Sequence, residues 1–169
     1  TILGLSSLLR GESIEYITAA TTVKAICISD ELVLSLYKNE KIFKKFCDET
    51  LFPPEILKLT QNLINKSIRT DINLISAFNI LIKNAKLNSF DESYSVVENN
   101  GLKSFIASNN IQGKSIDEHV SDNLNLIQNS IFAGRIISIK DDLYQAFLEK
   151  NNTNKSDVRD NEIMNTKEI

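Results

Sequence analysis

The fold of this chain is decided by the stretch Lys24-Ala-Ile-Cys-Ile-Ser-Asp-Glu-Leu-Val-Leu-Ser-Leu36. Its first half is rich in residues that suit a pleated, half-buried surface, and its second half changes to helical spacing. The stretch aligns without gaps to Arg135-Ile-Ile-Ser-Ile-Lys-Asp-Asp-Leu-Tyr-Gln-Ala-Phe147. Both begin with a basic residue, continue as an alternating strand and end in a helix capped by an Asp. A duplicated strand-then-helix unit explains this pair, and chance convergence of a common pattern is the alternative.

The region around the first unit predicts strands. Thr, Val and Ile are frequent from residue 16 to residue 28, and we expect strands at 15–20 and 22–28. Cys27 falls in an apolar run, and free Cys is among the most buried residue types, so we expect Cys27 in the core. An apolar stretch over residues 3–10 ends at Gly11.

Helices are predicted over the next fifty residues. Ser29 or Asp30 can cap a helix over residues 30–37, and a second helix follows through Ile42, Phe43 and Phe46. Pro53 and Pro54 stop the chain and restart it, because Pro is tolerated only in the first turn of a helix. Apolar spacing then predicts helices over residues 54–66 and 71–86, with a domain boundary between them at 66–71.

The second half of the chain changes character after Asn88. Short strands are predicted at 94–97, 102–107 and 136–139, and the polar residues from Asn151 onward predict a disordered tail or linker. The expected fold is α+β, a partial antiparallel β-roll followed by helices and a second small β-containing module. The expected division is 1–50 for the end of the first domain, 51–87 for a helical linker, 88–150 for the second β-rich module and 151–169 for the tail.

Composition excludes several classes of protein. The chain is 42% hydrophobic and 24% charged with a net charge of -3, so it is globular and offers no electrostatic reason to bind nucleic acid. No window is long and apolar enough to span a bilayer, so we expect a soluble protein without membrane insertion. Two Cys residues are too few for a disulfide framework, which favours a reducing, cytoplasmic setting. The chain opens on Thr1 with sequence typical of the middle of a domain, and we expect polypeptide before it.

A family resemblance lies in the first 50 residues. The segment Leu3-Gly-Leu-Ser-Ser-Leu-Leu-Arg-Gly-Glu-Ser-Ile-Glu-Tyr-Ile-Thr-Ala-Ala-Thr-Thr-Val-Lys-Ala-Ile-Cys-Ile28 resembles the phosphate-binding cassette and following strands of the cyclic-nucleotide-binding domain family. Gly4 matches the start of the cassette and Gly11 matches its turn. The resemblance implies a β-roll whose first strands lie upstream of Thr1. The ligand-pocket candidates are Gly4, Leu5, Ser6, Ser7, Arg10, Gly11 and Ile14.

The chemistry that binds a cyclic nucleotide in that family is missing here. The family's Glu falls on Leu5 and its Arg falls on Ile14, next to Glu15, whose charge would repel a phosphate. A charge-assisted hydrogen bond contributes about 1.5–3 kcal/mol, and both charged partners are lost. We therefore expect no binding of cAMP or cGMP and no cofactor. Arg10 and Glu12 could substitute from shifted positions, so an altered anion or nucleotide site stays open.

A narrower resemblance concerns the parent protein. The form Leu-Gly-x-Ser-Ser-Leu-Leu-Arg-Gly, which begins at Leu3, looks like the cytoplasmic N-terminal region of cyanobacterial peptidase-containing ABC transporters of the haemolysin-exporter type. The resemblance implies a regulatory fragment that contacts other domains of a transport assembly on the cytosolic face of a membrane.

Catalytic motifs are weak. Gly113-Lys114-Ser115 matches the end of a phosphate-binding P-loop, but its first glycine is replaced by Ser108, which favours a polar turn. His119 stands alone among acidic residues, and no peptidase motif surrounds Cys47. We expect no enzyme. A ligand-blind docking module is the leading hypothesis, a small-molecule sensor is the second, and a nucleotide enzyme that uses Lys114 is the last.

Overall fold

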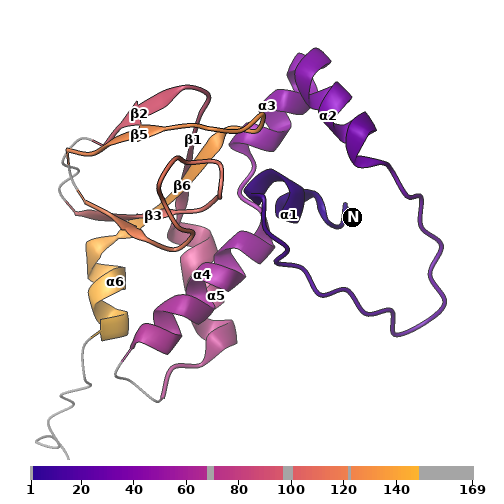
Figure 1. Ribbon diagram of the computed structural model, residues 1–169. Helices are drawn as coiled ribbons and strands as arrows, with labels where there is room; N and C mark the ends of the chain where they lie inside the picture. Colours follow the sequence, from indigo (N-terminus) through magenta and orange to yellow (C-terminus); the bar gives the residue numbers. More distant parts are fainter. Residues whose placement is uncertain (1, 68–70, 97–100, 122, 149–169) are drawn as a thin grey trace, which may run out of the picture.

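The computed structural model describes residues 2–67, 71–96, 101–121 and 123–148. Its fold is α+β, as the sequence predicts; five of the six described helices lie in the first half of the chain, and all the described strands lie in the second (Figure 1). No helix within these ranges is long and apolar enough to cross a membrane. The helices are α1 (Leu5–Arg10), α2 (Asp30–Asn39), α3 (Lys41–Glu49), α4 (Pro53–Lys66), α5 (Leu74–Asn84) and α6 (Asp141–Leu148).

The strands form two antiparallel sheets. Sheet A has the order β1-β6-β3-β4, and β2 pairs with β5 in a separate ribbon. The central strand β6 is buried from its first residue to Ile139, which explains why its sequence is apolar on both faces. Ile137 lies opposite Leu87 of β1 and Phe105 of β3. The strands are β1 (Lys86–Phe90), β2 (Ser93–Ser95), β3 (Leu102–Ile106), β4 (His119–Val120), β5 (Asn125–Ile127) and β6 (Gly134–Lys140).

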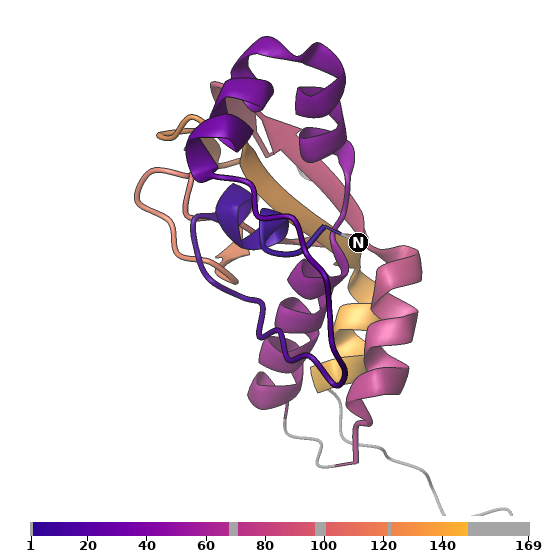
Figure 2. The same ribbon diagram turned by 90° about the vertical axis from the view of Figure 1, so that its right-hand side faces the viewer.

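Each face of sheet A is covered by a different layer. Helices α4, α5 and α6 pack on one face, where Ile137 and Ile139 meet Leu59, Leu81 and Phe147 in the largest core (Figure 2). The ribbon β2–β5 and its loops cover the opposite face. The predicted helical linker 51–87 therefore shares a hydrophobic core with the β-rich residues that follow it. The second core is made by Phe90, Val96, Ile106, Ile111, Val120, Leu126 and Ile136.

The predicted helix signals agree well with the observed ends. The Ser29 side chain accepts a hydrogen bond from the N–H of Leu32 at 3.4 Å and caps α2. Pro53 opens α4, and Asn73 caps α5 by accepting from Ser76 at 3.0 Å. Helix α5 ends at Asn84, earlier than the predicted residue 86, because the chain enters β1 there.

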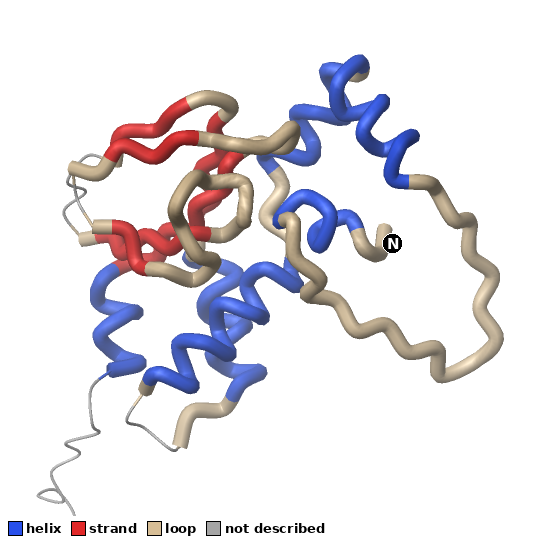
Figure 3. Tube along the Cα trace, viewed as in Figure 1, coloured by secondary structure: helices blue, strands red, loops and turns tan. Residues whose placement is uncertain are grey.

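The strands predicted at 15–20 and 22–28 are wrong. Residues 12–29 contain no strand and run as a wide, extended loop between α1 and α2 (Figure 3). Cys27, predicted in the core, is exposed. A strand needs a hydrogen-bonded neighbour, and within the described residues none lies beside this segment. The predicted tail 151–169, and Val97 at the end of one predicted strand, lie outside the described residues.

Candidate functional site: the cassette-like turn and its contacts

The carboxylate of Glu15 closes the turn over the N-terminal end of α1. Its Oε2 accepts a hydrogen bond from the backbone N–H of Gly4 at 2.8 Å, and its Oε1 accepts one from the hydroxyl of Ser6. Gly4 has a φ of 82°, a left-handed conformation that favours glycine. Polar donors at the start of α1 are therefore bound by an anionic group of the same chain.

Three other predicted pocket residues in this turn have internal roles. The N–H of Ile14 donates to the hydroxyl of Ser7 at 3.1 Å, which fixes the return of the chain after α1. Leu5 is buried with Leu9 and Tyr37 in a third hydrophobic core. The turn is thus held by its own side chains on one side and by the core on the other.

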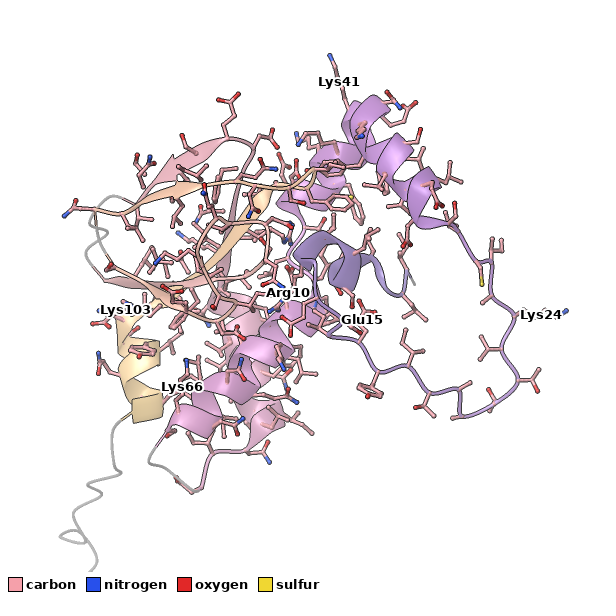
Figure 4. All side chains as sticks on the ribbon, in the orientation of Figure 1. Arg10, Glu15, Lys24, Lys41, Lys66 and Lys103 are labelled. Carbon is pink, nitrogen blue, oxygen red and sulfur yellow. The ribbon has the colours of Figure 1, made fainter. Side chains whose placement is uncertain are left out.

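Arg10 is buried completely. Within the described part of the chain, its Nε and Nη2 have no hydrogen-bond partner. Burial lowers the pKa of Arg10, while the charges of Asp117, Glu55 and Glu12 act to raise it and Arg135 acts to lower it. Burial also raises the pKa of Asp117. Arg10 therefore lies among charged groups of α4 and the second half of the chain, where the turn meets the rest of the molecule (Figure 4).

Two asparagines attach the end of α1 to the β-rich part. The N–H of Asn109 donates to the carbonyl of Arg10 at 2.8 Å, and its Nδ2 donates to the carbonyl of Gly11 at 3.2 Å. The buried Asn110 donates from Nδ2 to the carbonyl of Leu9 at 2.7 Å. Gly11 has a φ of 68°, and a Cβ there would lie 3.4 Å from Oδ1 of Asn110. Left-handed geometry and close approach both favour glycine at this position.

Comparisons with known proteins add nothing to this site. No protein-family model matches the chain, and searches of curated proteins and of solved structures found no match. The resemblance to cyclic-nucleotide-binding domains therefore depends on the quoted residues alone.

A polar network anchors the α2–α3 hairpin. The Tyr37 hydroxyl donates to Asp48 at 2.6 Å and accepts from the N–H of Ala133 at 3.1 Å. Lys44 binds Asp48 at 2.6 Å and Asp91 at 2.8 Å, which links α3 to the turn after β1. Burial, and the hydrogen bond to Asp48, raise the pKa of Tyr37 to about 12. The hairpin is therefore attached to the β-rich part at two points.

A buried ion pair joins β6 to α4. Arg135 donates from Nε and Nη2 to the two carboxylate oxygens of Glu55, both at 2.8 Å, and neither side chain is exposed. The same guanidinium donates to the carbonyls of Cys47 and Thr50 at 2.8 Å, and Glu55 also accepts from the N–H of Phe52 at 3.0 Å. Since every charged atom has partners, this pair acts as a structural clamp between α3, α4 and sheet A.

The P-loop-like motif forms a closed turn. Gly113 has a φ of 66°, and no helix follows it, although a P-loop requires one. Lys114 is bound to Glu118 at 2.6 Å, and the N–H of Ser115 donates to Glu118 at 3.1 Å. The hydrogen bond from Lys114 lowers the pKa of Glu118. Lys114 is therefore engaged by a carboxylate of the same turn.

The other reactive residues lie in structural positions. Cys47 is buried, and burial raises the pKa of its thiol to about 11, which opposes thiolate formation. The ring of His119 lies 5.7 Å from that of Phe105 and 6.3 Å from that of Tyr144. The described residues hold no group of three or more His, Cys, Asp or Glu that could bind a metal ion.

Sequence reasoning missed the residues that organise this region. It treated Glu15 as a repulsive charge, whereas the carboxylate fills the turn. Glu55 lies in the first turn of the helix that Pro53 opens, where an acidic residue is a known helix-start signal, so its contact with the N–H of Phe52 could have been found. The sequence around Arg135 does not predict its pairing with Glu55, which lies 80 residues away. The contact between Tyr37 and Ala133 is likewise unpredictable, because 96 residues separate the two.

Proposed function

We propose that this chain is a non-catalytic regulatory or docking module with a degenerate cyclic-nucleotide-binding fold at its N-terminal end. The observation that carries the proposal is the position of Glu15, whose carboxylate accepts from Gly4 and Ser6. A phosphate at this turn would have to displace that carboxylate and would be repelled by its charge. The turn is therefore occupied by the protein's own anion.

The position of Arg10 supports the same proposal. A cyclic phosphate requires a guanidinium that can reach it, and the family's Arg position holds Ile14 in this chain. Arg10, the nearest substitute, is buried where α1 contacts the β-rich part. The turn therefore docks onto the β-rich part of the same chain, where Asn109 and Asn110 hydrogen-bond its backbone carbonyls.

The contacts suggest how such a module would communicate. Displacement of the turn would act on the β-rich part through α1, and on the α2–α3 hairpin through the core shared by Leu9, Tyr37 and Phe132. Helix hairpins that move against a rigid sheet are a common two-state element. The proposed partners are other domains of a larger parent protein, in a peptide-exporting ABC transporter assembly at the cytosolic face of a membrane. A net charge of -3 supports a role without nucleic acid.

A second candidate function is a sensor with an altered cassette. The observation that favours it is the unpartnered Nε and Nη2 of Arg10. A small anion that reached these atoms would gain charge-assisted hydrogen bonds that the described residues do not supply. This alternative requires α1 to move, because Arg10 is buried.

Thermal unfolding with cAMP, cGMP, ATP or phosphate separates the two candidates. A ligand at 100 times its Kd stabilises a protein by about 2.7 kcal/mol, which shifts the Tm by several degrees. We expect no shift with any of the four. A shift that disappears in Arg10→Met would establish the sensor and overturn the ligand-blind module. A shift with phosphate that persists in Arg10→Met would be a general anion effect and would leave the ligand-blind module in place.

The transporter part of the proposal has a separate test. The coding sequence beyond Ile169 should encode a Cys peptidase, membrane-spanning helices and an ATPase in the same reading frame. A reading frame that lacks all three would contradict the assignment to an exporter, and would leave the docking role to be judged by the ligand experiment.

A further inference from the structure

The extended segment 22–29 exposes an apolar sequence to solvent. Every residue from 16 to 30 is exposed. The largest apolar side chains of the segment, Val23, Ile26 and Ile28, are 64%, 92% and 56% exposed. Single exposed apolar side chains are common on proteins, but a run of them on one extended segment marks an interaction site.

The backbone of this segment is as open as its side chains. The chain bends at Ala20 and Thr21 and then runs without a further bend to Ser29. Within the described residues, no backbone hydrogen bond links residues 16–28 to another part of the chain. An extended strand with open N–H and C=O groups is a template for pairing with a second strand. The loop stands away from the body of the molecule, with Lys24 pointing outward, so another chain can reach it (Figure 4).

The aligned segment in the second half of the chain shows how this pattern pairs. Ile26 and Ile28 align with Ile137 and Ile139 of β6, which are at most 2% exposed. Strand β6 lies between β1 and β3 and is antiparallel to both. A neighbour of the first segment is therefore expected to be antiparallel as well, and the sheets of the described residues supply none.

The charges around the segment favour a second copy of the chain as that neighbour. Lys24 is the only charged residue from 16 to 29, and Asp30 follows at the start of α2. If two copies pair antiparallel about Cys27, Lys24 of each copy lies opposite Asp30 of the other, which stabilises the pair. A parallel pair in register would instead place Lys24 beside Lys24, and like charges at this distance repel.

The same register matches the apolar side chains. Ile26 of each copy lies opposite Ile28 of the other, so four isoleucines share one face of the ribbon between the two ion pairs. A shift by one residue in either direction would place Ile26 opposite Cys27 or Ser29, and would also break the ion pairs. The segment is therefore complementary to itself in one antiparallel register.

We propose that two copies of this chain associate through residues 24–30, as an antiparallel strand pair about a twofold axis at Cys27. Such a contact is isologous, because both copies use the same surface. About seven residues from each copy take part, fewer than the roughly 20–30 a side of a standard interface, so the dimer is weak, with a Kd of about 10–1,000 µM. In dilute solution, at about 1 µM, the chain is then a monomer, and its unfolding reports on the monomer. This partner goes beyond the regulatory role proposed above.

Reversal of the charges tests the pairing. Sedimentation equilibrium of the 169-residue chain from about 5 µM to about 1 mM should show a shift from monomer to dimer. Lys24→Asp and Asp30→Lys should each weaken self-association at least about tenfold, because each places like charges opposite each other at both ends of the pair. An equal mixture of the two variants should regain the dimer, since each supplies the charge that the other lacks. Lys41→Asp, the same change at an exposed position of α3, is the control and should leave the dimer intact.

Cys27 tests the register without a change of charge. Two thiols that face each other across an antiparallel pair are close enough to form a disulfide, and the other thiol, Cys47, is buried. With diamide as the oxidant, which accepts the two electrons and two protons, the chain should form a dimer linked through Cys27. The matched control is Cys27→Ser with Ala25→Cys, whose thiols lie roughly 14 Å apart along the two strands and should cross-link at least about tenfold more slowly.

Three results would overturn the proposal. A chain that stays monomeric up to about 1 mM would leave residues 22–29 to a different protein or to a lipid surface. Association that Lys24→Asp does not weaken, or that grows beyond a dimer, would come from another surface. Equal cross-linking of the parent chain and the Ala25→Cys control would show that the contact has no fixed register. None of these measurements involves a nucleotide, so failure here is distinct from failure of the ligand-blind module.

Discussion

The segment 24–36 and the segment 135–147 share one sequence pattern but have different environments. The second lies in the middle of sheet A, with a strand on each side and a covered face above and below. The first enters a helix at the same point but runs through solvent before it. The helix forms in both units because its hydrogen bonds are local, whereas a strand exists only where another strand meets it.

The two units also differ in the environment of the basic residue with which each begins. Arg135 and Lys24 occupy equivalent positions at the start of the two units. Arg135 is buried and bound to Glu55, Cys47 and Thr50, and Lys24 is exposed on the loop. The basic residue at this position is therefore a buried structural residue in the second unit and an exposed loop residue in the first.

The largest predicted effect concerns this pair of basic residues. Arg135→Met should lower the free energy of unfolding by about 3–5 kcal/mol, because it leaves the buried carboxylate of Glu55 without its cation. Lys24→Met should change it by no more than about 0.5 kcal/mol. Urea unfolding of the two variants beside the parent chain measures both. Equal effects would show that the two units are not distinguished by burial.

The next effect compares the two aligned isoleucines. Ile137→Ala should cost about 2–5 kcal/mol, because it leaves a cavity between sheet A and the helices. Ile26→Ala should have almost no effect in this chain, since the side chain is 92% exposed. The free energies come from urea unfolding of both variants. A loss above about 1 kcal/mol for Ile26→Ala would mean that residues 22–28 already pack against something in solution.

The sequence predicts the helices of this fold better than its strands, because helix hydrogen bonds are local and strands need a neighbouring strand. Local signals identify α2, α4 and α5, because Ser29, the two prolines and the apolar spacing act within a few residues. The longer strands β3 and β6 are also confirmed, since their apolar runs are distinct. The strands β1, β4 and β5 were not predicted; β4 and β5 are only two or three residues long.

The candidate site was only partly predictable. The sequence identifies the turn from Gly4 to Ile14, and the structure shows that four of its residues, Gly4, Ser6, Ser7 and Ile14, are held together by contacts within the turn. It does not identify Asn109 and Asn110 as the residues that bind this turn, because they lie about 100 residues away. The prediction that Cys27 is buried is wrong for the same reason as the strands predicted at 15–20 and 22–28. The residues have the pattern of a strand, but a strand is buried only where a neighbouring strand pairs with it.

Tyr37 directly follows the first unit in α2 and attaches that helix to the β-rich part, so it offers a smaller and sharper test. Tyr37→Phe removes a hydroxyl that binds Asp48, Lys44 and Ala133 but keeps the ring against Phe132. The expected loss is about 1–3 kcal/mol, because a buried backbone N–H and a carboxylate each lose a partner. Thermal unfolding measures this loss. As the control, Tyr16→Phe on the exposed loop should leave the Tm unchanged.

The smallest expected effect is the dependence of the Tyr37 contribution on pH. The pKa of Tyr37 is raised in the folded chain from an ordinary value of 10 to about 12, chiefly by burial and then by its bond to Asp48. In the unfolded chain the phenol ionises near pH 10, so the stability that neutral Tyr37 contributes is complete below pH 10 and is lost as the pH rises to 12. The difference in unfolding free energy between the parent chain and Tyr37→Phe should therefore be constant from pH 7 to pH 9 and shrink above pH 10. A difference that stays constant up to pH 12 would show that the hydroxyl of Tyr37 is in contact with water, and that the first unit has no buried anchor in this region.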